Sequence, residues 1–468
     1  MKRHLLLIMG VISFSLIVAY RAHQIPITHD EASTFLNFRN LSVWSCISNL
    51  KCWDTANNHW LNTLLMQWSV SVFGDHAWVV RLPNVLAGLS YFICAALLAA
   101  LFIKNSFLQL AGLVVLCGHV YLLDFFSLAR GYGLMTAGVI WGIYGMLRYI
   151  EQWDRRWLLA SISALLFAIL GNFTGLLPWA AIASGWLVWI LASKKQDLLL
   201  RHGLYWLVSA ALLFVLLRFP ITALSKSGEF EWGASNPWVM GLDLLGNLLY
   251  GVGYFGEDTF QYAIFLVMFF VLICFLGALG SGFKERKRPV LFMLLLLVLN
   301  VVVIILQEQI TGAKAPIGRK SLYLIPVVFG LFAVALGLLR NAGTISFVGI
   351  IVTLAFIGHL IFTLPMKSCR EWYYDAYYPE LFSEILPQGR DSDSVRLGAT
   401  WIFYPALVFY QKTTQLPFEE PAYQRPLEID STMDYYYVEP RDTSGMIRSG
   451  FEIEKRVGPF FLFKRSRQ

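Results

Sequence analysis

The stretch LLASISALLFAILGNFTGLLPWAAIASGWLVWILAS, which covers residues 158–193, contains no Asp, Glu, Lys or Arg. A single helix needs about 20 apolar residues to cross the hydrocarbon core of a bilayer, so this stretch is too long for one span. Residues that favour turns interrupt it near its middle: Gly171, Asn172, Gly175 and Pro178. We therefore predict two membrane-spanning helices, over 158–174 and 176–193, joined by a tight hairpin.

Uncharged apolar runs recur along the 468 residues, of which 57% are hydrophobic and only 14% are charged. The mean hydropathy is +0.59, whereas a soluble domain carries roughly 25% charged residues. The composition therefore predicts an α-helical polytopic membrane protein with about 11 spans. The expected spans are 5–20, 77–103, 105–123, 132–150, 158–174, 176–193, 203–219, 259–283, 289–307, 321–339 and 343–365.

The positions of the basic residues predict the orientation of the chain. The net charge of +7 gives little support for nucleic-acid binding, because most Lys and Arg residues form short clusters between the apolar runs. Lys2 and Arg3 precede the first span, and every second connection after it is basic, as the positive-inside rule requires of cytoplasmic loops. No clear small-x-small cleavage site follows the first run, so we expect it to remain as a helix.

Most of the sequence between the spans then lies outside the cytosol, in four segments: 21–76, 220–258, 308–320 and 366–468. The cytoplasmic connections are too short for a nucleotide-binding domain and contain no glycine-rich phosphate loop. Chemistry is therefore expected on the outer face, where ATP and nucleotide sugars are not available. An activated substrate must arrive there already attached to a lipid.

The composition changes after Met366, because residues 367–468 are charged, contain Pro and are rich in Tyr. We predict a membrane domain over 1–366 and a small α/β domain outside the membrane over 367–468. Its expected elements are strands near 395–400, 435–438, 452–457 and 460–464 and a helix at 406–413.

The first external loop contains the sequence Thr28-His29-Asp30-Glu31 shortly after the first span. Two adjacent carboxylates there can sit at the membrane surface, and one could accept the proton of a hydroxyl that attacks a sugar. The same residues also fit the capping box Thr28-x-x-Glu31 of a following helix. The two interpretations are compatible, because a capped helix would hold the carboxylates in place.

This loop offers neither a clear metal site nor a clear disulfide. His29 beside Asp30 and Glu31 could help to hold a divalent cation, but no His or Cys cluster has the spacing of a metal site. We therefore predict no metal and no cofactor. Cys46 and Cys52 could form a disulfide outside the cytosol, and the sequence leaves this open.

Basic residues on the outer face are further candidates, because they depart from the positive-inside trend. Arg130 lies in an external turn, where it could pair with Asp124 or bind a phosphate. Arg319 and Lys320 lie just before the tenth span, where they could hold a lipid phosphate or form a basic turn at the lipid headgroups. Arg81, at the outer end of the second span, fits a snorkelling anchor.

In their order along the chain these motifs resemble those of the GT-C glycosyltransferases, most closely the protein-mannosyltransferase-like branch (family 39). That branch includes protein O-mannosyltransferases and lipid A aminoarabinose transferases. The resemblance covers residues 5–340 and rests on His29-Asp30-Glu31-Ala32, Asn58-His59-Trp60, Phe73-Gly74-Asp75, Arg81-Leu82-Pro83, Ala129-Arg130-x-Tyr132 and Arg319-Lys320-x-x-Tyr323. The chain departs from the family pattern at Trp60-Leu61 and at Gly131, where members often have proline.

The resemblance implies a role for each of these residues. Asp30 would act as the catalytic base or orient the acceptor, with Glu31 beside it. Arg319 or Lys320 would contact the phosphate of the lipid. The remaining members of the expected set that binds the lipid phosphate and sugar are His59, Arg81, Arg130, Tyr132 and Tyr323.

The sequence thus predicts an inverting glycosyltransferase that moves a hexosyl or pentosyl group from a polyprenyl phosphate to an acceptor on the periplasmic face of a bacterial inner membrane. The acceptor, whether lipid, glycan or protein, stays open, and membrane lipids are the other expected partners. Two alternatives are a transporter or flippase of lipid-linked sugars and a non-catalytic envelope assembly protein. The nearly charge-free spans argue against a transport pathway, because transporters place ionisable residues near mid-span.

Overall fold

The computed structural model describes most of the chain: residues 4–43, 45, 57–252, 284–338, 342–385, 395–414, 416, 418, 419, 421 and 425–466. The chain divides into two compact units, each built from separate segments. The first, the membrane unit, comprises Met1–Ala19, Ser42–Leu65 and Pro83–Leu364. The second, the loop–tail unit, comprises Tyr20–Leu41, Met66–Leu82 and Pro365–Gln468.

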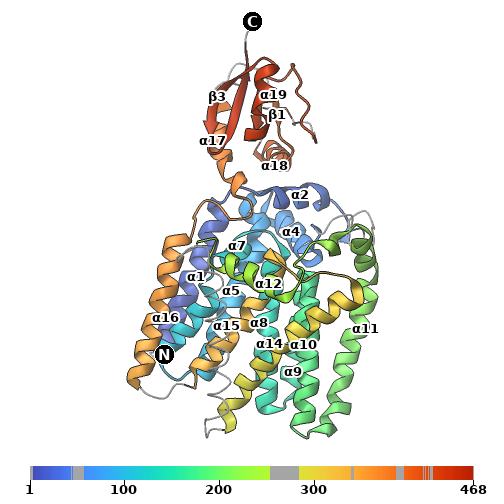
Figure 1. The fold of residues 1–468 in the computed structure, drawn as a ribbon, viewed down its shortest axis with the longest axis vertical. Coiled ribbons are helices and arrows are strands. Elements are labelled where there is room, and N and C mark those ends of the chain that lie inside the picture. The colour runs from blue at the N-terminus through green and yellow to red at the C-terminus, as the bar shows by residue number, and fades with distance from the viewer. Residues whose placement is uncertain are drawn as a thin grey trace. The chain divides into compact units, whose positions relative to one another are not determined.

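Long apolar helices make up most of the described chain (Figure 1). They are α1 (Leu5–Gln24), α5 (Ala77–Phe102), α8 (Gly131–Gln152), α9 (Arg155–Gly171), α10 (Leu176–Ala192), α11 (Gln196–Lys226), α14 (Lys284–Thr311), α15 (Leu324–Leu336) and α16 (Ala342–Thr363). Among the described residues, five helices are long and apolar enough to cross a membrane, or six if the bent pair α6 and α7 is one span. The chain is a multi-pass membrane protein. The full count of eleven spans stays a prediction, since the expected span at 259–283 lies outside the described residues.

The predicted break within residues 158–193 is confirmed. Helix α9 ends at Gly171, a single 3₁₀ turn covers Phe173–Gly175, and α10 follows at once. The Asn172 side chain caps this turn by accepting the backbone N–H of Thr174 at 2.9 Å. The polar residue that marked the break in the sequence therefore caps the turn between the two helices.

The span predicted at 105–123 is not one continuous helix. Two helices replace it, α6 (Ser106–Cys117) and α7 (Val120–Ser127), and their axes differ by 65°. A Cβ on Gly118 would lie 2.7 Å from the carbonyl oxygen of Val114, so the break needs glycine there. The next residue, His119, donates from Nε2 to the carbonyl of Val115 at 2.7 Å and so satisfies an acceptor that the break leaves exposed.

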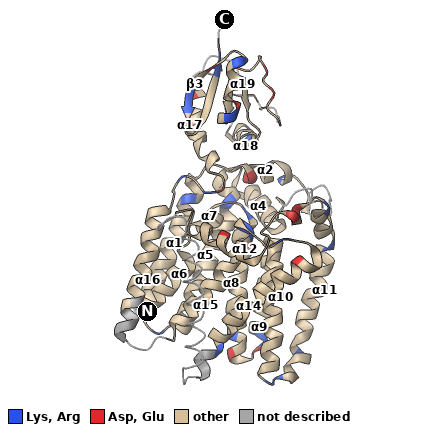
Figure 2. Cartoon of the chain, in the orientation of Figure 1, with Lys and Arg blue, Asp and Glu red and all other residues tan. Residues whose placement is uncertain are grey.

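Within the membrane unit, α8 is the most enclosed of the long helices and packs along α9 (Figure 1). Glycines on α8 permit this close approach: a Cβ on Gly138 would lie 2.6 Å from the Ala164 carbonyl oxygen, and one on Gly145 would lie 2.9 Å from the Ser161 nitrogen. Helix α10 packs against α14, and α6 packs against α15 and α16. The charged residues of this unit lie mainly toward the helix ends (Figure 2).

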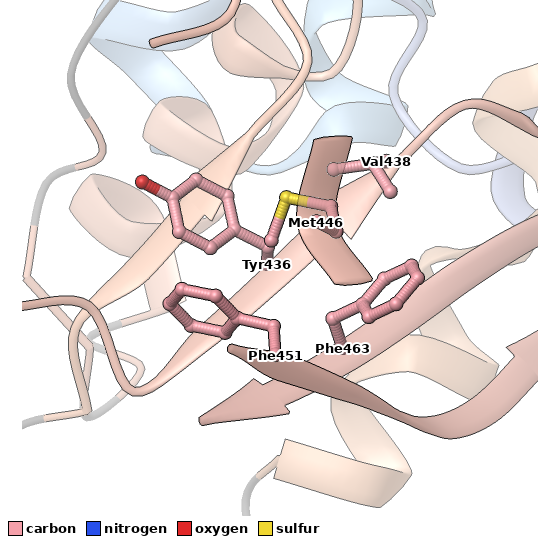
Figure 3. Packing of buried hydrophobic residues seen from close by; sticks show 5 residues of the cluster. All are labelled: Tyr436, Val438, Met446, Phe451 and Phe463. Atoms are coloured by element: carbon pink, nitrogen blue, oxygen red, sulfur yellow. The ribbon is translucent and has the colours of Figure 1, made fainter. Parts of the chain in front are cut away.

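The predicted α/β character of the tail is confirmed. Its four strands are β1 (Leu397–Ala399), β2 (Tyr435–Val438), β3 (Phe451–Val457) and β4 (Phe460–Arg465), in the order β1-β2-β4-β3. Strands β1 and β2 are parallel, and the other pairs are antiparallel. One side of the sheet packs on α19 (Thr443–Arg448) through a core of Tyr436, Val438, Met446, Phe451 and Phe463 (Figure 3).

The tail shares its unit with part of the first external loop. Helix α2 (His29–Phe38) packs against α18 (Tyr404–Thr414), and the rings of Phe35 and Phe409 meet edge to face with centroids 4.9 Å apart. Phe35 is the apolar residue that follows the Asp-Glu pair by one helical turn. This apolar residue of the loop therefore packs against the tail, at Phe409, 374 residues further along the chain.

Candidate functional site

The first loop forms the capped helix that the sequence predicts. Helix α2 begins at His29, directly after the extended residue Thr28. The Glu31 carboxylate accepts both the backbone N–H and the hydroxyl of Thr28, each at 3.0 Å, so the glutamate half of the capping box is formed. Both Asp30 and Glu31 are buried. The cap is thus real, and it fixes the backbone that carries Asp30.

Arg81 holds the same turn from the other side. Its guanidinium binds Glu31 with two hydrogen bonds, Nε to Oε1 at 2.8 Å and Nη2 to Oε2 at 2.6 Å. The three remaining N–H groups donate to backbone carbonyls of Ala22, Ile25 and Pro26 at 2.5–2.9 Å. All five donors of this fully buried side chain therefore have partners within the protein.

This geometry corrects the interpretation of Arg81. A snorkelling anchor extends its charge into water, whereas the Arg81 side chain has no exposed surface. Nor does it offer a donor to a lipid phosphate or a sugar, since protein atoms take all five. Arg81 is therefore a positioning residue for Glu31 and for the chain at 22–26. None of its donors is left to bind a substrate.

Two groups of the tail complete the surroundings of the Asp30 backbone. The Asp375 carboxylate accepts the backbone N–H of His29 at 2.7 Å, and the Tyr410 hydroxyl accepts that of Ile27 at 3.0 Å. The imidazole of His29 also donates from Nδ1 to the carbonyl of Ile402 at 2.7 Å. Sequence analysis missed Asp375 and Tyr410, because neither lies in a motif and more than 340 residues separate them from the loop.

Asp375 is an unusual carboxyl group. Burial raises its pKa well above the ordinary value, and the nearby charges of Asp30 and Glu31 raise it further. The hydrogen bonds from His29 and from the Tyr378 hydroxyl, the latter at 2.8 Å, oppose this rise. The loop–tail unit therefore concentrates three carboxyl groups around one helix start.

The membrane unit contains a cavity of about 550 Å³. One part of its lining is apolar and comes from the α9–α10 turn and from α11: Leu170, Phe173, Leu176, Leu177, Ile221 and Leu224. The other part is polar and includes three lysines: Asn58, His59, Lys226, Glu229, Lys314 and Lys320. A site of this composition suits an amphiphile with an apolar chain and an anionic head.

The basic turn 318–320 borders this cavity and is held by a residue that the sequence did not reveal. Asp243 in α12 (Pro237–Leu248) accepts the backbone N–H of Gly318 at 2.5 Å. Lys320 donates from Nζ to the carbonyl of Trp232 at 3.2 Å. Burial lowers the pKa of Lys320, which Glu229 partly offsets. The turn therefore presents its cations from a backbone that is fixed by hydrogen bonds.

His59 lies near two of the expected cations, Arg130 and Arg319. Its pKa is well below the ordinary value because the ring is buried and because Arg130 and Arg319 repel a positive charge there. The ring therefore stays neutral near pH 7. Its Nδ1 lies 3.2 Å from the Asn172 amide, and its Nε2 has no hydrogen-bond partner among the described residues. A neutral imidazole in the cavity lining can thus bind a ligand atom.

The structure brings five expected residues of the membrane unit together. The rings of Tyr132 and His59 meet edge to face with centroids 5.2 Å apart. The Arg319 guanidinium lies 5.8 Å from the centre of the Tyr132 ring. Arg130 is buried and donates to the Asn57 side chain at 3.1 Å, and Lys320 completes the group. Tyr323 stands apart from the cavity lining: it is fully buried, and its hydroxyl has no hydrogen-bond partner among the described residues.

Gly131 explains one departure from the family pattern. A Cβ at this position would lie 1.9 Å from the carbonyl oxygen of Gly171 and 2.7 Å from Cβ of His59. Proline or alanine therefore cannot occupy this site without moving the backbone. The glycine lets the turn that carries Arg130 approach the α9–α10 turn and the His59 segment.

Replacing Gly131 by alanine is expected to destabilise the protein by about 1–3 kcal/mol, because a well-packed backbone must shift to accept the methyl group. Thermal unfolding of the purified protein in detergent measures this loss. Gly358→Ala, in α16, is the matched control, since no atom lies within 4 Å of a Cβ built there. Equal unfolding temperatures for the two variants would contradict the packing described for Gly131.

Comparison with known proteins establishes the fold. No family model and no curated protein matches the chain. Apo ArnT from Cupriavidus metallidurans matches with a TM-score of 0.56 at 13% identity, over 98% of this chain and 99% of that one. The chain has the fold of ArnT. The structure of that ArnT bound to undecaprenyl phosphate matches with a TM-score of 0.52 at 14% identity, over the same shares of both chains.

The likeness to ArnT confirms the expected resemblance at the level of the fold alone. At such low identity it says nothing about substrates, so the activity must be argued from the residues. No group of three or more His, Cys, Asp or Glu side chains suited to a metal ion occurs among the described residues. Cys46 and Cys52 lie outside them.

Proposed function

We propose that this protein transfers a sugar from a polyprenyl-phosphate-linked donor to an acceptor at the periplasmic face of a bacterial inner membrane. The observation that carries the proposal is the cavity of the membrane unit, which combines an apolar wall with a cationic rim. The ArnT fold supports it, because a structure with this fold is known with undecaprenyl phosphate bound.

In this proposal the cavity holds the donor. The first isoprenyl units of the lipid contact the leucines of α9 and α10, and the phosphate binds Lys320 and Arg319, with Arg130 and neutral His59 nearby. As the bond between the sugar and the phosphate breaks, negative charge develops on the phosphate oxygens. Cations that are fixed in advance stabilise this charge without reorganising.

The first loop supplies the acid–base group. Asp30 takes the proton from the acceptor hydroxyl as its oxygen attacks the anomeric carbon, and Glu31 and Arg81 hold the turn that carries Asp30. Attack in line with the leaving phosphate inverts the anomeric centre. If the acceptor is itself a phosphate, no proton is removed and Asp30 orients the acceptor instead. The acceptor can be a lipid, a glycan or a protein.

Transfer from the donor tests this function. The protein is reconstituted in liposomes with labelled undecaprenyl-phosphate-linked hexoses and pentoses, and an envelope extract serves as acceptor. Arg319→Ala is expected to raise the donor KM about 10- to 100-fold, because hydrogen bonds to charged groups contribute about 1.5–3 kcal/mol. Arg201→Ala, an exposed arginine in α11, is the control and should leave the donor KM unchanged. The same donor KM in both variants would contradict the phosphate site.

A further inference from the structure

We propose that the C-terminal tail positions the catalytic loop, and that Asp375 and Tyr410 are the positioning residues through which it does so. This inference rests on the proposed function, since it assigns the tail a part in the reaction of Asp30. It gives residues 365–466 a task beyond that of a separate domain attached to a membrane enzyme.

The first observation is that the tail binds backbone groups of the loop directly. Tyr410 accepts the N–H of Ile27 at 3.0 Å, and Asp375 accepts that of His29 at 2.7 Å. These two bonds flank Thr28, the residue that begins the helix cap. They therefore fix the direction in which the chain enters α2.

The second observation concerns the place of Asp375 at the helix start. The first N–H groups of a helix have no partner within the helix, so they need an acceptor from elsewhere. Glu31 satisfies Thr28 from within the helix, and Asp375 satisfies His29 from the tail. Asp30 is the next residue after His29, so the two carboxylates determine where its Cα lies.

The third observation is that the tail groups are themselves held rigidly. The Tyr378 hydroxyl donates to Asp375 at 2.8 Å. The Tyr410 ring packs against Tyr378 and Phe382, with centroids 5.7 and 5.2 Å apart. A positioning residue needs this support, because a catalytic group displaced by about 1 Å can lose 100-fold in rate.

A second attachment holds the beginning of the tail. Arg21, at the end of α1, donates from Nε to the carbonyl of Pro365 at 2.9 Å and from Nη2 to that of Ser368 at 3.1 Å. Its side chain is fully buried. The tail is therefore tied to the chain just before the loop as well as to the loop itself, which limits how far Asp375 can move.

The test measures kcat and the donor KM of the full-length protein in liposomes. Asp375→Ala is expected to lower kcat about 10- to 100-fold with the donor KM unchanged, because the loop loses its alignment and the cavity does not. Asp375→Asn keeps an oxygen acceptor for the His29 N–H and should recover most of this loss. Tyr410→Phe, which removes only the hydroxyl, should lower kcat by about 5- to 10-fold, since a hydrogen bond contributes about 1 kcal/mol.

Glu384→Ala is the matched control, because its partner is Lys455 within the tail, at 2.5 Å. It should leave kcat unchanged.

Wild-type kcat in Asp375→Ala and Tyr410→Phe, with Asp30→Asn inactive, would overturn the positioning role and leave the proposed function intact. An equal loss in Asp375→Asn and Asp375→Ala, with both folded, would also overturn it. If Asp375→Ala does not fold, the asparagine and phenylalanine variants decide. Full activity in Asp30→Asn would instead refute the function itself.

Discussion

Asp30→Asn is expected to lower the rate of sugar transfer by about 10²–10⁴-fold, the usual contribution of a general acid or base. The amide has nearly the same shape as the carboxyl group but cannot accept a proton from an acceptor hydroxyl. Thr28, Glu31 and Asp375 hold the first turn of α2, and Phe35 packs the helix against α18, so the variant should fold. Transfer from labelled donor in liposomes measures the loss, and the unfolding temperature checks the fold.

A second acid of the same loop serves as the control for Asp30. Asp75 forms an ion pair with Arg39 within the loop–tail unit. Asp75→Asn removes one negative charge from the same unit, yet it should retain nearly all of the wild-type rate. Full transfer activity in folded Asp30→Asn would remove Asp30 from the reaction. If the Asp30 variant proves inactive only with hydroxyl acceptors, the residue acts as a base rather than by orienting the acceptor.

Arg81→Ala is expected to destabilise the protein by about 3–5 kcal/mol, the usual effect of removing one partner of a buried ion pair. The substitution leaves the Glu31 carboxylate buried without its cation and leaves three backbone carbonyls without their donors. Arg81→Lys should recover only part of this loss, because an ammonium group has three donors and Arg81 uses five. The midpoint of thermal unfolding measures each change.

A double variant separates the ion pair from the packing. Glu31→Gln with Arg81→Met removes both charges, so it should be less destabilising than Arg81→Ala alone. Arg39→Ala breaks the more exposed ion pair with Asp75 and should change stability by less than about 1 kcal/mol. If Arg81→Ala unfolds at the same temperature as Arg39→Ala, the five-bond arrangement does not stabilise the loop.

Much of the local structure follows from the sequence by itself. The turn residues Asn172 and Gly175 separated α9 from α10, and runs of strand-forming residues such as Val, Tyr and Phe marked the four strands of the tail. Thr28 and Glu31 marked the start of α2. Each of these features depends on neighbours within a few residues, because capping, turn formation and strand propensity are short-range effects.

Residues that act across long separations needed the tertiary structure. Arg81 looked like a lone charge at a helix end, but the fold buries it against Glu31 and three carbonyls, which no spacing in the sequence reveals. The break at Gly118 also escaped prediction, since an isolated glycine in an apolar run is compatible with a continuous helix. Only the packing around it decides between the two.

The fold also decided which candidates share a site. The sequence placed His59, Arg130, Tyr132, Arg319 and Lys320 on one side of the membrane, and the structure groups them around the rings of His59 and Tyr132 beside one cavity. The roles of Asp243 and Asp375 emerged only from the structure, because each accepts a hydrogen bond from a backbone N–H group of a distant segment. Any residue type can supply such a group, so the sequence determined which side chains could act, and the tertiary structure decided which backbone each of them holds in place.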